Sequence, residues 1–245
     1  MTFEVIEFRG AGVRPPILFL HEGLGSARQW RDFPARVAAA TGHDAFAYSR
    51  RGYGASSPVT LPRPLDYMER DAREDVPRVL AELGLFRTIL FGHSDGASIA
   101  LLFAAEHPNV EALVLEAPHV FVEDVSIASI RAAKASYEEG DLREKLSRYH
   151  EHVDVAFRGW NEAWLDPGFR TWNIEHTLAK ITAPILVIQS EDDPYGTRAQ
   201  VDAITLQAKG PVTPLFLPRC GHAPHRDQPD AVLEAVTAFV ARLDR

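Results

Sequence analysis

Short apolar runs alternate with longer segments that carry apolar residues at helical spacing over most of this 245-residue chain. The runs are rich in β-branched and aromatic residues and are bounded by glycine, proline or charged residues, as is typical of buried strands. Strands that alternate with helices at this spacing predict an α/β fold, in which a mostly parallel central sheet carries helices on both faces. The buried strands are predicted at 17–20, 45–48, 88–91, 112–115 and 183–188.

The ends of the chain and the connecting segments give weaker signals. Residues 2–8 alternate apolar and polar positions and predict a half-exposed strand, and the glycines and prolines of 10–16 predict a turn. Pro214 cannot donate to a strand ladder, so the last strand, 212–217, is predicted at an edge of the sheet. Helices are predicted at 26–40 with Ser26 as N-cap, at 66–83, after the serine turn near residue 94, at 197–209 and at 230–243.

The alternation of strands and helices stops between residues 119 and 181. This segment has charged helical patches and no run that predicts a buried strand. We therefore predict a core formed by 1–118 and 182–245, with 119–181 inserted as a helical cap over the carboxyl edge of the sheet. The cap holds an unusual number of aromatic residues, namely Phe157, Trp160, Trp164, Phe169 and Trp172.

Composition narrows the classes of partner. The formal charge of −8 argues against nucleic acid or an anionic membrane, because such surfaces are bound by clustered Lys and Arg. The first residues show no basic and apolar leader pattern, and no apolar run approaches the ~20 residues that span a bilayer. Cys220 is the only cysteine, which fits a reducing compartment. These features predict a cytoplasmic protein with a small-molecule substrate. They do not decide whether the protein is a monomer or a homodimer.

One glycine-flanked serine stands where a predicted strand meets a predicted helix. Gly92-His93-Ser94-Asp95-Gly96 matches G-x-S-x-G, in which the glycines permit a turn so tight that backbone approaches backbone. Such a turn exposes the serine at its tip. The strand before it and the helix after it are the context in which this motif indicates a nucleophile.

The chain resembles the α/β-hydrolase superfamily over nearly its whole length, in particular the capped branch of esterases, lactonases and carbon-carbon bond hydrolases. Four stretches carry the resemblance in the family's order: Leu20-His21-Glu22-Gly23, Arg51-Gly52-Tyr53-Gly54-Ala55-Ser56, the turn around Ser94, and Gly221-His222. The resemblance implies a serine nucleophile, an acid and a histidine in that sequence order. It also excludes haloalkane dehalogenases and epoxide hydrolases, which need Asp at the position of Ser94.

The resemblance assigns catalytic roles to three side chains. Ser94 is the nucleophile and His222 the base that takes its proton. A carboxylate must orient His222, and the loop after the penultimate strand offers Glu191, Asp192 and Asp193. The family's G-x-x-D placement selects Asp193. Asp192 and Glu116, at the end of the strand that follows the serine helix, are the alternatives.

Backbone N–H groups are expected to bind the oxyanion of the tetrahedral intermediate. The resemblance implies the N–H groups of Gly23 and Asp95. The sequence departs from the family here, because His-Gly is replaced by His21-Glu22, so Leu24 could supply the second donor instead of Gly23. Glu22 also places a carboxylate near the site, which would orient substrate or water, or pair with Arg50 or Arg51.

Three further residues are predicted to contact substrate together with Glu22: His119 at the start of the cap, and Trp160 and Trp164 within it. The pairs His150/His152 and His222/His225 have spacings that a metal could use, but no cysteine pair supports them. We predict no metal ligands and no cofactor.

The sequence thus predicts a cofactor-independent serine hydrolase that cleaves a carboxylic ester or lactone through an acyl-enzyme. The aromatic cap favours an apolar or aromatic acyl group. The same residues could hydrolyse a carbon-carbon bond in a vinylogous diketone. A ligand-binding homologue without catalysis is a third hypothesis, which an intact triad disfavours.

Overall fold

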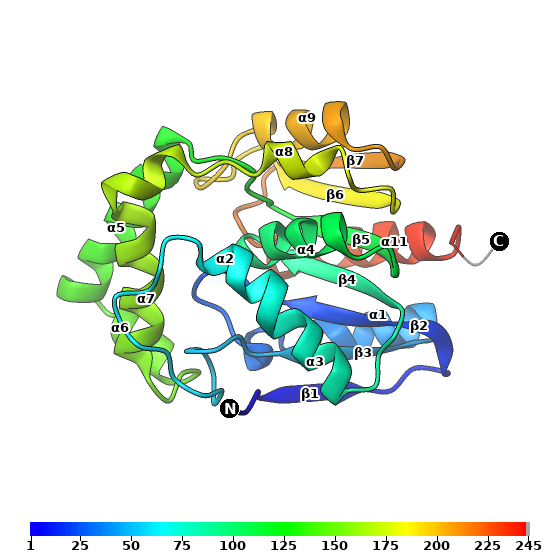
Figure 1. The fold of residues 1–245 in the computed structure, drawn as a ribbon, viewed down its shortest axis with the longest axis horizontal. Coiled ribbons are helices and arrows are strands. Elements are labelled where there is room, and N and C mark those ends of the chain that lie inside the picture. The colour runs from blue at the N-terminus through cyan, green and yellow to red at the C-terminus, as the bar shows by residue number, and fades with distance from the viewer. Residues whose placement is uncertain (244–245) are drawn as a thin grey trace.

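The computed structural model describes residues 1–243, which form a seven-stranded sheet with helices on both faces, as predicted (Figure 1). The strand order is β1-β3-β2-β4-β5-β6-β7, and every neighbouring pair is parallel except β1 with β3. The strands are β1 (Val5–Phe8), β2 (Val13–Leu20), β3 (His43–Tyr48), β4 (Thr88–His93), β5 (Val110–Glu116), β6 (Ile185–Ser190) and β7 (Val212–Leu217). The prediction that Pro214 lies in an edge strand is confirmed.

The central strands are apolar on both faces because each face is covered. Along β2, Ile17 and Phe19 face one hydrophobic core, and Leu18 and Leu20 face the other. The first core lies under α1 (Phe33–Thr41) and α11 (Pro229–Val240), which pack against each other. The second lies under α2 (Tyr67–Arg70), α3 (Val76–Glu82), α4 (Asp95–Glu106) and α9 (Arg198–Gln207).

The segment between β5 and β6 contains helices and no named strand. Its elements are α5 (Asp124–Glu139), α6 (Leu142–Ser147), α7 (Val153–Leu165), the 3-10 turn η3 (Pro167–Thr171) and α8 (Glu175–Leu178). Helices α5, α6 and α7 stand beside the carboxyl ends of the strands, whereas α8 packs against α4 and α9 (Figure 1). The division into a core and a separate cap at residues 119 and 181 stays a proposal.

Two local predictions are wrong. The strand β2 begins at Val13, inside the segment predicted as a turn. Its register with β3 shifts between Val13 and Ile17, where two prolines lack the backbone N–H that a strand ladder needs. The first helix does not run continuously from Ser26. A 3-10 turn, η1 (Ala27–Trp30), comes first, Arg31 has φ 55°, and α1 then starts at Phe33.

The helix predicted at 66–83 is present as α2, a π-helical turn η2 (Asp71–Asp75) and α3. At the C-terminal end, α10 (Pro224–Asp227) precedes α11. None of the helices within residues 1–243 is long and apolar enough to cross a membrane.

Candidate active site

Ser94 lies at the turn between β4 and α4, in a backbone conformation that few non-glycine residues adopt. Its φ of 53° and ψ of −118° place the side chain at the tip of the turn. Both flanking glycines are required sterically. A Cβ on Gly92 would lie 2.5 Å from the Ala97 Cα, and one on Gly96 would lie 2.1 Å from the Leu20 carbonyl oxygen. A side chain at either glycine would therefore collide with backbone, as the motif implied.

The three side chains predicted as the triad form one hydrogen-bonded chain. The Ser94 Oγ lies 2.9 Å from the His222 Nε2. On the other side of the ring, the His222 Nδ1 lies 2.9 Å from both carboxylate oxygens of Asp193. The three residues come from the ends of β4 and β6 and from the loop after β7, which meet at the carboxyl edge of the sheet. This geometry can move a proton from the serine to the imidazole.

The Asp193 carboxylate is held in its ionised form. The backbone N–H of Tyr195 donates to its Oδ1 at 2.8 Å, and the Gln189 side chain donates to its Oδ2 at 2.9 Å. Burial alone would raise the pKa of Asp193, but the hydrogen bond and charge of His222 and the Tyr195 amide outweigh it, so the pKa lies below its ordinary value. An ionised carboxylate can fix the tautomer of His222 and stabilise its imidazolium form.

The alternative acids have other partners. The Asp192 Oδ2 accepts a hydrogen bond from the Arg219 backbone N–H at 3.0 Å. The Glu116 Oε2 lies 2.6 Å from the His225 Nδ1. The structure therefore brings Asp193 to His222 and directs the other two carboxylates elsewhere.

A cavity of about 130 Å³ opens beside Ser94. All of the predicted oxyanion donors line it, both Gly23 and Asp95 and the alternative Leu24, as do the predicted substrate contacts Glu22, His119, Trp160 and Trp164; the other lining residues are Ser94, His222, Ser126, Ile130 and Tyr195. A Cβ on Gly23 would lie 2.1 Å from the Trp160 Nε1. Glycine at this position thus lets the indole pack against the loop that follows β2.

His119 places a neutral imidazole in this cavity. The residue is 3% exposed, and burial, followed by the electrostatic effect of the neighbouring His222, lowers the pKa of His119 to about 4. Its Nδ1 has no hydrogen-bond partner among the residues 1–243. The ring contacts Trp164 edge to face, with 5.3 Å between the ring centroids.

Of the two roles left open for Glu22, pairing with an arginine side chain is not found among residues 1–243. Its Oε2 instead lies 3.5 Å from the Nδ1 of His93, and Arg50 contacts only the backbone oxygen of Glu22. Burial would lower the pKa of His93, but the adjacent Glu22 carboxylate, followed by the charge of Glu116, raises it to about 9. The Nε2 of His93 lies 2.6 Å from the backbone oxygen of His222. His93 thereby ties Glu22 to the loop that carries the base.

Three of the histidines considered for metal binding, His150, His222 and His225, have other hydrogen-bond partners in the structure. His150 is buried, where its Nδ1 accepts from the Gly54 N–H at 3.0 Å and its Nε2 lies 3.0 Å from the Leu24 oxygen. A cluster with metal-ligand spacing lies elsewhere, where one ligand atom each of His93, Glu116 and His225 fall within 4.8 Å of one another. Only His225 belonged to a pair singled out from the sequence.

Sequence reasoning missed Ser126, Ile130 and Tyr195 as lining residues. Ser126 and Ile130 are four positions apart on α5 and share its buried face, so helical periodicity within the segment could have identified them. Tyr195 follows Asp193 by two residues in the loop after β6, and its ring packs against His222 with 4.6 Å between the centroids. Its position two residues after the predicted acid could have indicated that it lies near the cavity.

Comparisons with known proteins show which family the chain belongs to. A model described as "Alpha/beta hydrolase family" matches residues 17–235. Human serine hydrolase BPHL is 32% identical over 178 residues, which are 67% of this chain but only 58% of the human protein. A putative carbamate hydrolase, RutD, of Variovorax paradoxus is 30% identical over 251 residues and 92% of each chain.

Among solved structures, a proline iminopeptidase of Mycobacterium smegmatis aligns with a TM-score of 0.79 at 19% identity, over 99% of this chain and 95% of that one. At this identity the likeness concerns the fold. The family match covers most of the chain, and its curated relatives are named hydrolases. The protein therefore belongs to the alpha/beta hydrolase family, as its sequence motifs predicted.

Proposed function

We propose that the protein is a cofactor-independent serine hydrolase that cleaves a carboxylic ester or lactone with a compact apolar or aromatic acyl group. The observation that carries this proposal is the unbroken chain from the Ser94 Oγ through His222 to Asp193. The match to a family whose curated relatives are named serine and carbamate hydrolases supports the hydrolase class. The choice of an ester or lactone as substrate, and the role of each residue, are proposed here.

In the proposed mechanism His222 takes the proton of Ser94 as the hydroxyl attacks the substrate carbonyl. The N–H groups of Gly23, or of Leu24, and of Asp95 bind the oxyanion, and each such donor contributes ~10²–10³ in rate. His222 then returns the proton to the leaving alcohol. Water attacks the acyl-enzyme by the same route, with His222 again as base and Asp193 holding its tautomer.

The size of the cavity favours a small acyl group. About 130 Å³ is well below the ~300–1,000 Å³ of drug-sized ligand sites and close to the ~150 Å³ of a cavity that holds one benzene. Trp160, Trp164 and Ile130 supply apolar walls. A single aromatic ring, such as a benzoyl group, matches these features better than a long acyl chain does.

Labelling by a fluorophosphonate probe, followed by a substrate panel, tests the proposal. We expect stoichiometric modification at Ser94, none in Ser94→Ala, and a higher kcat/KM for aryl esters than for acetate or long-chain esters. Turnover of a ring-cleavage diketone in preference to every ester, lactone and carbamate would assign the carbon-carbon bond reaction instead. Folded protein that neither labels nor turns over any substrate would indicate a ligand-binding homologue.

A further inference from the structure

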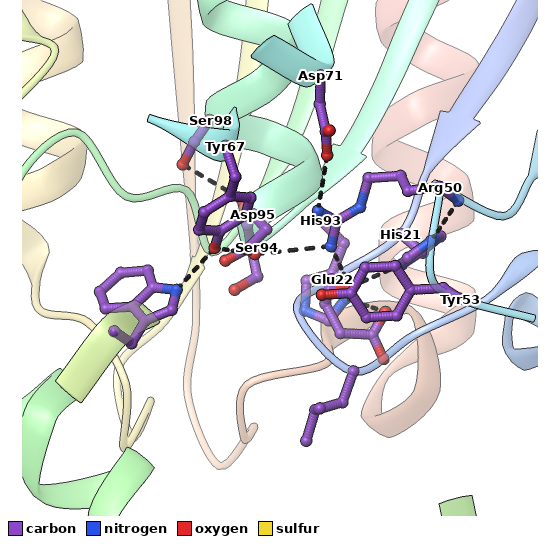
Figure 2. A network of polar contacts seen from close by, with 12 residues as sticks. His21, Glu22, Arg50, Tyr53, Tyr67, Asp71, His93, Ser94, Asp95 and Ser98 are labelled. Carbon is purple, nitrogen blue, oxygen red and sulfur yellow. Dashed lines mark hydrogen bonds and ion pairs between the residues drawn. The ribbon is translucent and has the colours of Figure 1, made fainter. Parts of the chain in front are cut away.

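Arg50 is a fully buried arginine that lies between the two backbone segments predicted to bind the oxyanion. It follows β3, and its guanidinium reaches both the loop after β2 and the start of α4 (Figure 2). Its Nη2 donates to the backbone oxygen of Glu22 at 2.9 Å and lies 3.6 Å from the Asp95 Oδ2, and its Nη1 donates to the Asp71 Oδ2 at 3.3 Å. The group is also stacked on Tyr53, 4.7 Å from the ring centroid.

The bond to the Glu22 oxygen fixes a peptide whose other end is a predicted oxyanion donor. The Glu22 carbonyl and the Gly23 N–H belong to the same planar trans peptide, so they point in opposite directions. Three donors hold this carbonyl: the Gly25 backbone N–H donates to it at 3.1 Å, the His21 Nδ1 lies 2.7 Å from it, and Arg50 is the one charged donor. The His21 Nε2 accepts from the Arg50 N–H at 3.0 Å, which leaves the proton on Nδ1. Holding the carbonyl on one side therefore directs the Gly23 N–H to the other.

The second contact concerns the charge of Asp95. A carboxylate beside the nucleophile would oppose an oxyanion that develops at the Asp95 N–H. The Trp164 indole donates to the Tyr67 oxygen at 3.0 Å. The Tyr67 hydroxyl donates in turn to the Asp95 Oδ2 at 2.5 Å, and the Arg50 guanidinium faces the same carboxylate (Figure 2). These contacts hold the carboxylate and offset its charge.

We propose that Arg50 is a positioning residue of the oxyanion hole, which aligns the Glu22–Gly23 peptide and neutralises Asp95 beside Ser94. This inference rests on the proposed hydrolysis, because it assigns a role in stabilising its tetrahedral intermediate. A planar guanidinium has five donors in a fixed geometry and reaches three acceptors at once. A lysine in its place could serve only part of this set.

Arg51 provides a matched control. It is the next residue, but its side chain is partly exposed and its Nε donates to the Asp75 Oδ2 at 2.6 Å, away from the Glu22 and Asp95 contacts. A lysine at either position removes the same guanidinium. Only the Arg50 substitution should disturb the oxyanion donors.

Arg50→Lys and Arg51→Lys are compared in kcat, KM and affinity for benzeneboronic acid, whose adduct with serine mimics the tetrahedral intermediate. For Arg50→Lys we expect kcat to fall by up to ~10²-fold, which is the effect of losing one oxyanion donor, with KM within about twofold. The boronate affinity should fall by the same factor as kcat/KM. Arg51→Lys should change neither. Equal boronate affinity in the two variants overturns the proposal, as does loss of kcat without matching loss of boronate affinity.

Paired substitutions of His21 decide the question if Arg50→Lys does not fold, as judged by circular dichroism. The amide of His21→Asn can place a donor where the Nδ1 lies, whereas His21→Gln reaches the Nε2 position and loses that donor. We expect His21→Gln to lose kcat and boronate affinity together and His21→Asn to retain more of both. The reverse order overturns the role assigned to the Glu22 carbonyl. Absence of labelling and turnover in the wild-type protein would instead refute the proposed function itself.

Discussion

The cavity beside Ser94 has two walls of different construction. One wall is formed by the ends of the strands and their loops, where Ser94, His222 and Asp193 are joined by hydrogen bonds of 2.9 Å. The other wall comes from α5 and α7, where Trp164 packs against Phe169 with 4.9 Å between the ring centroids. The first wall acts through the direction of its hydrogen bonds and through its charges. The second wall acts through the volume that it leaves for the acyl group.

This difference separates the expected consequences of substitution. Hydrogen bonds in the first wall act on the barrier of the reaction and lose their effect with displacements of a fraction of an ångström. The aromatic wall determines which acyl groups fit, and a well-chosen replacement there leaves the reacting atoms in place. Substitutions in the strand-end wall should therefore reduce the rate for all substrates. Substitutions in the helical wall should change their ranking.

The largest effect is expected for Ser94→Ala. Removal of the nucleophile should lower kcat on the order of 10⁴–10⁶-fold for every substrate. The thermal midpoint should change little, because the removed hydroxyl belongs to a side chain at the tip of a turn. Steady-state kinetics with an aryl ester and a thermal scan measure the two quantities. Substantial residual turnover in protein free of wild-type contamination would contradict the nucleophile assignment.

Asp193→Asn should be the next most damaging change, with kcat about 10³–10⁴-fold lower, because an amide cannot hold the tautomer of His222. Asp192→Asn and Glu116→Gln are the isosteric controls, since their carboxylates contact Arg219 and His225 instead. A comparison of kcat among the three variants, each shown to be folded, tests the acid. A larger loss in either control would move the role away from Asp193.

The strand-end wall could be predicted from the sequence because it depends on local signals. Tight turns need glycine where a Cβ would collide with backbone, and this requirement makes Gly92 and Gly96 recognisable on either side of Ser94. Parallel strands end at one edge of the sheet, so residues that follow different strands meet there. The order of serine, acid and histidine could thus be matched to a known fold before any distance was available.

Long-range choices in the same region could not be predicted. Whether Glu22 pairs with an arginine or with His93 depends on how the ends of β2, β3 and β4 pack against one another, which local sequence patterns do not specify. In the helical wall, all five predicted aromatics are buried, but only Trp160 and Trp164 line the cavity. Helical periodicity shows that a face is buried without showing what covers it.

The helical wall is tested by Trp160→Phe, which removes one ring and enlarges the cavity. We expect kcat/KM for a bulkier aryl ester to rise about tenfold relative to that for a small ester, because one or two extra carbons are worth ~1–3 kcal/mol in such a pocket. Trp172→Phe is the control, because Trp172 is buried in the same segment but does not line the cavity. The ratio of the two kcat/KM values is measured for both variants. An unchanged ratio in Trp160→Phe would assign this residue to packing alone.

The smallest effect is expected from the pair of Glu22 and His93, which belongs to the strand-end wall yet should change stability more than rate. The pKa of His93 is about 9 in the folded protein, against ~6.5 in the unfolded chain. Between these values the folded state binds more protons, so the free energy of unfolding should fall as pH rises from 6.5 through 9. The contribution is fully present below pH 6.5.

Glu22→Gln should weaken this pH dependence, because the neutral amide no longer favours the charged imidazole. The difference between a pKa of about 9 and the ~6.5 of the unfolded chain limits the wild-type fall in stability to ~3 kcal/mol. Because Glu116 and the His222 carbonyl still raise the pKa of His93, we expect the fall between pH 6.5 and 9 to shrink by about 1 kcal/mol. Urea unfolding at the two pH values measures it, with Glu7→Gln as control, since Glu7 pairs with Arg9 at the exposed edge strand β1. If Glu22→Gln lowers stability equally at both pH values, Glu22 contributes to packing and does not set the charge of His93.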